Sequence, residues 1–296
     1  MLKVVTHNGP FHADDVLAFA LICAFVDGNA TVTRSRSPQD WDAGDIVIDV
    51  GGVYEPDQGR FDHHQASYEG PLSSAGMVAQ WLEDTGKIDS EVASALRTQV
   101  VDYVDDVDNG RLRPQPHIPC FANQVQAFNH GNSTLEAYDS AFKRAAKFAE
   151  RYVRGIALGV AAVQSARVHV ARAMAAAVEQ GSNIMELTEY CKWKHAYFDL
   201  GGSEHPTEYA LYPGMDGKWH VLAIPPALGD FGQKRSLPES WAGLTGSSLE
   251  AQTGVPGSRF CHKNLFIAVF SDRAGALKAL EMSGRRWRNQ SREGAA

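Results

Sequence analysis

Three short apolar segments in the first 64 residues each lead into side chains that bind metal ions. The segments cover residues 2–5, residues 46–48 and the approach to Phe61. The side chains that follow them are His7, His12 and Asp14 after the first, Asp49 after the second, and Asp62, His63 and His64 after the third. Parallel strands end at one edge of an open sheet, where ligand sites collect. We therefore expect an α/β fold with a mostly parallel sheet and one shared site at that edge.

The mixture of imidazole and carboxylate groups indicates which ions the site takes. Together these ligands suit Mn²⁺, Mg²⁺, Zn²⁺ or Fe²⁺. Two such ions about 3.5 to 4 Å apart can clamp a phosphoryl group during hydrolysis, but a ligand has to bridge them. Asp49, alone at the end of its strand, is the predicted bridge. The other predicted ligands are His7 and His12 for the first ion, and Asp14, His63 and one carboxylate from residues 105–108 for the second.

Two neighbouring side chains are predicted to take part in the reaction without binding the ions directly. His64 remains as a non-ligand, and an imidazole beside a dication can donate a proton to a leaving oxygen. Asp62 is predicted to fix the tautomer of a neighbouring metal-binding imidazole.

Each of these residues also has a simpler interpretation. Asp14 and Asp15 fall in the first turn of a predicted helix, where acidic side chains cap the helix and complement its dipole. Asp49 stands shortly before two glycines and could form a turn. The Asp-His-His triplet could be a polar loop. Because all of these residues fall at predicted strand ends within one compact segment, we favour the metal site.

Composition and charge limit the class of protein and its partners. A chain of 296 residues, 44% hydrophobic and 21% charged, is typical of a globular protein with about two domains. The net charge of −7 disfavours a broad surface that coats duplex DNA, because such surfaces need clustered Lys and Arg. If the substrate is a nucleic acid, we expect it to be short or single-stranded rather than duplex.

The distribution of cysteines and apolar residues bears on the compartment. The four cysteines include no Cys-x-x-Cys pair, so neither a thiolate zinc site nor a disulfide framework is predicted. The first strand begins at residue 2, which leaves no room for a cleaved signal, and the longest apolar stretch, residues 16–26, is too short to cross a bilayer. We expect a cytoplasmic protein without membrane attachment.

A helical stretch divides the chain into two predicted domains. Residues 135–180 contain no proline, are rich in Ala and carry apolar residues at helical spacing. This pattern predicts one long helix, or two helices broken near residues 155–159, with Gly181 as the terminator. The predicted domains are a catalytic domain, 1–180, and a smaller α+β domain, 181–296. The long helix could form a homodimer seam or pack between the domains.

Shorter elements are predicted within each domain. The first helix, residues 13–26, is apolar all round, which predicts burial between layers. The other predicted helices are 75–83, 90–103, 121–128 and 272–283, and the further predicted strands are 30–34, 184–187, 207–212, 219–224, 259–262 and 266–270. Residues 38–45 are expected to form a loop, and the basic tail 284–292 to fray.

The order of the motifs resembles a known superfamily. The segments 7–14, 47–52, 62–64 and 105–110 are together similar to the four motifs of the DHH phosphoesterase superfamily. More closely, residues 6–12 and 61–65 resemble the melanocyte proliferating gene one exonuclease family. Short sequence motifs at 193–195, 237–244 and 254–257 are also similar to those of this family, so the resemblance covers nearly the whole chain.

The resemblance implies a 3′-to-5′ exonuclease that acts on single-stranded RNA or DNA, or on short oligonucleotides, with two Mn²⁺ ions. Mg²⁺, Zn²⁺ and Fe²⁺ stay as alternatives, and His12, which stands where the superfamily pattern has an Asp, could favour a metal softer than Mn²⁺. In the fourth motif either Asp105 or Asp108 could be the ligand. We favour Asp105, which lies near a predicted helix end.

The second domain is implied to help hold the substrate. The candidates are Lys234 and Arg235, in a basic loop that contains glycine, and His262, which follows a predicted strand. Such side chains contact phosphates, although a solvated basic face is the simpler interpretation of Lys234. Two other functions stay open: a hydrolase of a small phosphate compound such as pyrophosphate, and a metal-binding regulatory protein.

Overall fold

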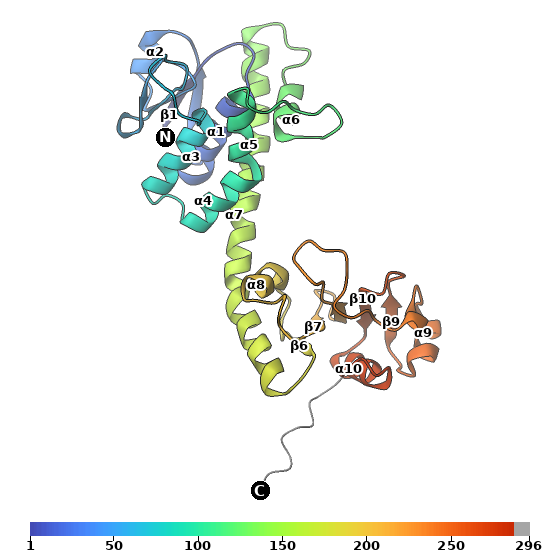
Figure 1. Cartoon of the computed structure of the whole chain (residues 1–296). Coiled ribbons are helices and arrows are strands. Elements are labelled where there is room, and N and C mark those ends of the chain that lie inside the picture. Colours follow the sequence, from blue (N-terminus) through green and yellow to red (C-terminus); the bar gives the residue numbers. More distant parts are fainter. Residues whose placement is uncertain (287–296) are drawn as a thin grey trace. The chain divides into compact units, whose positions relative to one another are not determined.

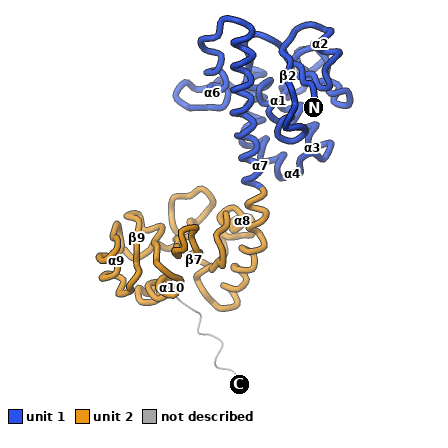
Figure 2. The backbone as a smooth tube through the Cα atoms, turned by 180° about the vertical axis from the view of Figure 1, so that it is seen from behind, with its two compact units in different colours: residues 1–160 blue, residues 161–296 orange. Residues whose placement is uncertain are grey.

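The computed structural model describes residues 1–286, and they form two compact units (Figures 1 and 2). The first unit is Met1–Val160 and the second begins at Ala161. This division falls inside a long helix, after residue 160, whereas the boundary expected from the sequence is residue 180. Each unit contains its own sheet and its own hydrophobic core.

A five-stranded sheet with the order β2-β1-β3-β5-β4 lies at the centre of the first unit. Its strands are β1 (Lys3–Thr6), β2 (Thr31–Arg34), β3 (Ile46–Ile48), β4 (Tyr54–Glu55) and β5 (Arg60–Phe61). Val and Ile dominate β1 and β3, as expected for strands buried in a pleated sheet. Four strands run parallel, and β4 pairs antiparallel with β5 at the edge. The predicted α/β class is confirmed, in the form of a mixed sheet.

The first unit also contains several helices. They are α1 (Ala13–Phe25), α2 (Pro38–Asp42), α3 (Ser74–Asp84), α4 (Ser90–Leu96), α5 (Asp102–Asp108) and α6 (Phe121–Ala127), with a short 3-10 helix η1 (Pro56–Gln58). Of these helices, α1 and α3 have the main contacts with the sheet. All residues of α1 from Ala13 to Cys23 are buried, which confirms the prediction for this helix. Its apolar side chains contact α3, α5, α6 and the sheet, so α1 is the central helix of the core.

The structure differs from the sequence-based elements at two places near the site. Residues Pro38–Asp42 form α2 and not a loop, because Pro38 occupies the first helical turn, where proline is well tolerated. The helix expected at 90–103 continues through a π turn, η2 (Arg97–Val101), to Asp108. Asp105 and Asp108 therefore lie within a helix, three residues apart, and Gly110 with φ +71° follows its end.

The long helical stretch forms one helix. α7 (Leu135–Glu179) has 45 residues and runs through both glycines at 155 and 159 without interruption. Gly181, with φ +55°, follows its C-terminal end, as predicted. Residues up to Ile156 pack in the core of the first unit, whereas residues from Ala166 onward pack in the second. α7 is thus an element of both units.

The second unit contains a mixed sheet with the order β6-β7-β8-β10-β9. Its strands are β6 (Ile184–Glu186), β7 (Tyr209–Pro213), β8 (Trp219–Ala223), β9 (Ser258–Cys261) and β10 (Ile267–Phe270). Its helices are α8 (Trp193–Asp199), α9 (Gly246–Thr253) and α10 (Arg273–Met282), with the 3-10 helix η3 (Glu239–Trp241). Only β6 and β7 pair in parallel. The predicted strands fall on these strands to within about two residues, whereas α8 and α9 were not predicted.

Two further expectations concern membrane-spanning helices and the C-terminal tail. Within residues 1–286, no helix combines the length and the apolar character needed to span a bilayer. In the tail expected to fray, the backbone N–H groups of Arg285 and Arg286 donate to Leu280 O at 2.9 and 3.0 Å. The remainder of that tail, from residue 287, lies outside the described residues.

Candidate metal centre

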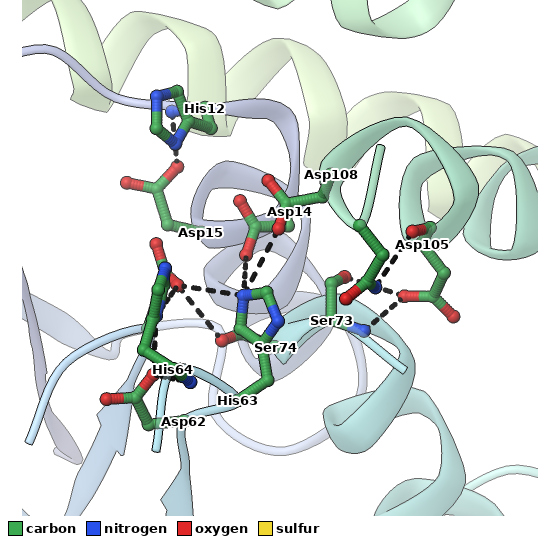
Figure 3. Close-up of polar contacts among 12 residues, drawn as sticks. His12, Asp14, Asp15, Asp62, His63, His64, Ser73, Ser74, Asp105 and Asp108 are labelled. Atoms are coloured by element: carbon green, nitrogen blue, oxygen red, sulfur yellow. Dashed lines mark hydrogen bonds and ion pairs between the residues drawn. The ribbon is translucent and has the colours of Figure 1, made fainter. Parts of the chain in front are cut away.

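The C-terminal ends of three parallel strands bring the predicted ligands together. His7 follows β1, Asp49 follows β3, and Asp62, His63 and His64 follow β5. α1 adds His12 and Asp14 from its N-terminal end, and α5 adds Asp108 from its C-terminal end. Figure 3 shows the side chains of Asp14 from α1 and Asp108 from α5 directed toward His63. Residues that are up to about 100 positions apart in the chain therefore share one site.

His7 lies between two carboxylates. Its Nε2 atom is 3.2 Å from Asp15 Oδ2 and 3.3 Å from Asp49 Oδ2, while its Nδ1 is 3.1 Å from the Asn8 carbonyl oxygen. The carbonyl contact directs Nε2 into the site. Single ligand atoms of His7, His12 and Asp49 all lie within 4.8 Å of one another, so these three residues could hold one ion.

Asp49 faces both halves of the centre. Its Oδ2 points to His7, and its Oδ1 lies 3.5 Å from His63 Nε2. The backbone of Asp49 is left-handed, with φ +55°, a conformation that Asp tolerates better than most non-glycine residues. A backbone N–H bond to Phe61 O, 3.0 Å long, fixes this turn against β5. The turn directs one carboxylate oxygen toward each histidine.

His63 lies against three carboxylates. Its Nε2 atom is 3.1 Å from Asp108 Oδ2, 3.5 Å from Asp49 Oδ1 and 3.9 Å from Asp14 Oδ2 (Figure 3). A further set of ligand atoms within 4.8 Å of one another comes from His12, Asp14 and Asp108. His63 and the carboxylates around it form the second half of the centre, opposite His7.

The surroundings of Asp14 indicate whether the site fits a cation. Its side chain is fully buried, and neither carboxylate oxygen has a hydrogen-bond partner among residues 1–286. Burial, together with the charges of Asp49 and Asp108, raises its pKa well above the ordinary value. A buried carboxylate without partners is costly. Because these oxygens accept no hydrogen bond and Oδ2 faces His63 at 3.9 Å, the donor set fits divalent cations with oxygen and imidazole ligands.

The electrostatics of the histidines and of Asp49 lead to the same conclusion. Burial would lower the pKa of His7, but Asp15 and Asp49 outweigh it and raise the pKa to about 10. For His63, Asp108 and Asp49 likewise outweigh burial and raise the pKa to about 10. Burial would raise the pKa of Asp49, but His63 and His7 hold it below the ordinary range. The carboxylates thus make the site negatively charged, and bound protons or metal ions can neutralise that charge.

Asp15 was considered only as a capping residue in the sequence, and it does cap α1. Its Oδ1 accepts hydrogen bonds from the backbone N–H groups of His12 and Val16, at 2.9 and 2.8 Å. Its Oδ2 is the oxygen that faces His7. Asp15 therefore connects the start of the helix to the first ligand. The capping interpretation describes Asp15 but not its neighbour Asp14.

Asp62 and His64 form a pair at the rim. Asp62 Oδ1 lies 2.8 Å from His64 Nδ1 and accepts the His64 backbone N–H at 3.1 Å, while Asp62 Oδ2 accepts the N–H of Gly52 at 2.6 Å. The carboxylate thus fixes His64, and not the more buried His63. The His64 side chain is 62% exposed, so its ring remains accessible to a substrate.

Asp105 and Asp108 have different surroundings. Asp105 Oδ1 accepts bonds from Ser73 N, Ser73 Oγ and Gly76 N, at 2.9, 2.6 and 3.1 Å. Burial raises its pKa to about 6 despite these three donors. Asp108 instead faces His63. Of the two candidates in the fourth motif, the structure brings Asp108 into the cluster and leaves the favoured Asp105 tied to the start of α3.

A cleft of about 700 Å³ opens onto the centre. His7, His12, Asp49, Asp62 and His64 line it together with Arg36 and Trp41, which the sequence analysis did not single out. Arg36 lies just beyond β2, at the same sheet edge as His7. A cation two residues past a predicted strand end was the available signal for Arg36.

The predicted substrate residues of the second unit are engaged with their own unit. Lys234 Nζ donates to Gly202 O, His205 O and Tyr197 Oη at 2.6, 2.8 and 3.2 Å. Arg235 lies 3.4 Å from Glu208 and donates to Gly284 O. His262 accepts the N–H of Asn264, and its ring packs 4.4 Å from the ring of Phe266. Lys234 in particular is neither free nor part of a solvated face.

Comparison with known proteins places the chain in a family. The family model MYG1_exonuc, described as "Uncharacterised protein family (UPF0160)", matches residues 3–283. A Chlamydia pneumoniae protein named MYG1 protein is 35% identical over 284 residues, which cover 95% of this chain and 96% of that protein. The human protein named MYG1 exonuclease is 31% identical over 318 residues, covering 93% and 84%. The predicted resemblance to the melanocyte proliferating gene one exonuclease family is confirmed, and the chain belongs to the MYG1 exonuclease family.

Proposed function

We propose that this protein is a metal-dependent phosphodiesterase that removes nucleotides from the 3′ end of single-stranded RNA or DNA, or of short oligonucleotides. The human and rat relatives are named exonucleases, which supports nuclease chemistry. The acidic net charge of −7 favours a short or single-stranded substrate over duplex. The 3′-to-5′ direction follows from the family resemblance of the sequence motifs.

The observation that carries the proposal is the position of Asp49 between two histidines. Its two oxygens face different histidines, at 3.3 Å from His7 and 3.5 Å from His63, so each oxygen would be available to a different cation. His7 and His12 would complete the first site, and Asp14, His63 and Asp108 the second. The proposed ions are two Mn²⁺, with Mg²⁺, Zn²⁺ and Fe²⁺ as alternatives. Bound there, two divalent ions would supply charge neutralisation and an activated water for attack on phosphorus.

The other residues of the site would position groups and move a proton. Asp62 holds His64 through both the ring Nδ1 and the backbone N–H, so Nε2 is the ring nitrogen that Asp62 leaves unbound, and the side chain is 62% exposed. That nitrogen can donate a proton to the oxygen that leaves when the phosphodiester bond breaks. Asp15 keeps His7 and the start of α1 in register through its two oxygens. His64 Nδ1 also lies 3.4 Å from Asp49 Oδ1, and Asp49, His63 and His64 form a third possible ligand set, so proton transfer would take place directly beside the ions.

The test is release of mononucleotides from RNA and DNA oligomers labelled at the 5′ or the 3′ end, with and without Mn²⁺. We expect release that depends on Mn²⁺ and shortens 5′-labelled oligomers stepwise. Asp49→Ala should abolish release, whereas Asp57→Ala, an exposed acidic residue of the same unit, should not change it.

Three outcomes would contradict the proposal. Equal activity of Asp49→Ala would remove the bridge. Release of phosphate from pyrophosphate, with no cleavage of oligomers, would indicate a hydrolase of small phosphate compounds. Fewer than two ions per chain at saturating Mn²⁺, with no turnover, would indicate a metal-binding regulatory protein.

A further inference from the structure

We infer that Arg36 and Trp41, on the connection between β2 and β3, form a subsite for the terminal nucleotide of the substrate. In this subsite the Arg36 guanidinium binds a phosphate and the Trp41 ring stacks on a base. The inference rests on the proposed function and adds the residues that hold the substrate beside the metal centre. Both residues belong to the first unit, as do the ligands.

The first argument is the position of these residues. The cleft that opens onto His7, Asp49 and His64 has Arg36 and Trp41 in its wall. Its volume of about 700 Å³ lies within the range of about 300 to 1,000 Å³ that is usual for small-molecule sites. Space for a nucleotide therefore exists next to the metal-binding side chains.

The second argument is the state of the Arg36 guanidinium. Arg36 is exposed and makes no hydrogen bond or ion pair with any residue from 1 to 286. The nearby Arg34 is different, since it is buried, donates to Gly9 O at 2.8 Å and pairs with Asp139 at 3.2 Å. Among the described residues that line the cleft, Arg36 is the only Lys or Arg. A free guanidinium beside the candidate metal-binding side chains suits a phosphate, which it can bind through two parallel N–H groups.

The third argument is the rigidity of the Trp41 ring. Its Nε1 donates to Ser35 O at 3.2 Å, and the ring packs against the cluster of Val5, Val47 and Val50. Gly51 passes close to the ring, because a Cβ built there would lie 3.7 Å from Trp41 Cε3. The ring still lines the cleft and is only partly buried. A fixed aromatic face costs little entropy to stack on, and stacking tolerates any base.

The inference predicts different effects on two probes. The probes are a fluorescent trinucleotide with uncleavable methylenephosphonate linkages and the same molecule without its 3′-terminal base. Affinity is measured by fluorescence anisotropy with Mn²⁺ present. Arg36→Met should weaken binding of both probes by about tenfold or more, because it removes a charge-assisted pair. Trp41→Leu keeps apolar packing, and it should weaken binding only of the probe that has the terminal base, by about tenfold.

Matched variants separate binding from folding. Trp41→Phe retains an aromatic ring and should restore most of the affinity lost in Trp41→Leu. Arg151→Met, which removes an exposed arginine of α7 in the same unit, should bind both probes like the wild type. Circular dichroism and thermal unfolding would show whether each variant is folded.

Hydrolysis of the unmodified trinucleotide, measured in parallel, distinguishes two kinds of failure. If the wild type cleaves and binds, and Arg36→Met and Trp41→Leu bind equally well, the subsite is overturned while the proposed function stands. Equal loss of affinity for both probes in Trp41→Leu would also overturn base stacking. If the wild type neither binds nor cleaves, the proposed function fails and the subsite fails with it.

Discussion

Asp108 Oδ2 lies 3.1 Å from His63 Nε2, although the two residues are 45 positions apart and come from a helix and from a strand end. The same helix carries Asp105, whose Oδ1 is already bound by Ser73 and Gly76. The helical spacing of three residues thus gives one carboxylate to the candidate metal centre and the other to the packing of α3 against α5.

We expect Asp108→Asn and Asp105→Asn to have different effects on metal binding. Asp108→Asn should lower Mn²⁺ affinity at one of the two sites by at least about tenfold, because a neutral amide replaces an anionic ligand. Asp105→Asn keeps a carbonyl oxygen for the donors on Ser73 and Gly76, so both sites should remain. Isothermal titration with Mn²⁺ gives the stoichiometry and the affinities. Loss of a site in Asp105→Asn alone would show that the fourth motif acts through Asp105.

Gly76→Ala should destabilise the first unit. A Cβ at this position would lie 2.2 Å from Asp105 Oδ2 and 2.6 Å from Oδ1, and hydrogen bonds hold that carboxylate in place. Crowding of this kind costs about 1 to 3 kcal/mol. Chemical denaturation followed by circular dichroism should show a lower free energy of unfolding.

Gly155→Ala is the matched control for this substitution. Gly155 is an exposed residue of α7, and a Cβ added to it would have no neighbouring atom within 4 Å. Alanine there should stabilise the helix by about 0.5 to 1 kcal/mol. Equal stability of Gly76→Ala and the wild type would mean that Asp105 is free to move.

Asn129→Ala should weaken the loop that carries the first ligands. The buried Asn129 side chain accepts the N–H of Phe11 at 3.1 Å and donates to Phe11 O at 2.7 Å. Its removal leaves two buried backbone groups unpaired, at a cost of about 1 to 3 kcal/mol for each group that stays dry. Because His12 follows Phe11, we also expect weaker Mn²⁺ binding at the first site.

Two measurements check the Asn129 prediction. Thermal unfolding reports the loss of stability, and Mn²⁺ titration reports the loss of affinity. Gln124→Ala, at an exposed position on α6, should leave both unchanged. A destabilised Asn129→Ala protein with unaltered Mn²⁺ affinity would show that the hydrogen bonds between Asn129 and Phe11 do not influence metal binding.

His205 should make the second unit less stable at mildly acidic pH. Burial and the charge of Lys234 lower its pKa below the ordinary value of 6.5. The unfolded chain therefore binds the proton at a higher pH than the folded chain does. Stability contributed by neutral His205 is present above about pH 6.5 and is lost as the pH falls toward the folded pKa.

Comparison of the wild type with His205→Gln isolates this contribution. Glutamine keeps a polar group near Thr207 Oγ1, which lies 2.8 Å from His205 Nδ1, but it does not titrate. Between pH 7.5 and pH 5 the unfolding free energy of the variant should fall less steeply. Parallel slopes for the two proteins would assign the pH dependence to other groups.

The sequence predicts those residues of the site that directly follow strands. Apolar segments before His7, Asp49 and His63 are enough to place these side chains at one edge, because parallel strands share their direction. The choice between Asp105 and Asp108 does not follow, since it depends on a π turn that extends a helix past residue 103. No local propensity at that point indicates the extra turn.

Other differences arise from contacts between distant residues. Lys234 and Arg235 suggest a phosphate-binding loop in the sequence, yet carbonyl groups and Glu208 from elsewhere in the second unit satisfy them. Trp41, which the sequence analysis did not consider, packs against the cluster of Val5, Val47 and Val50 and also lines the cleft. The pattern of hydrophobic residues predicts the elements, while the tertiary fold decides which polar groups stay available.

The left-handed backbone of Asp49 lowers the stability of the fold, while its side chain serves the proposed activity. A non-glycine residue with φ +55° carries a backbone cost of about 1 kcal/mol, which a glycine would avoid at the same place. Variants selected for heat resistance alone would therefore be expected to accumulate Gly at position 49 and to lose the carboxylate that faces both His7 and His63. The most strained non-glycine backbone of the site is thus the one whose side chain cannot be given up.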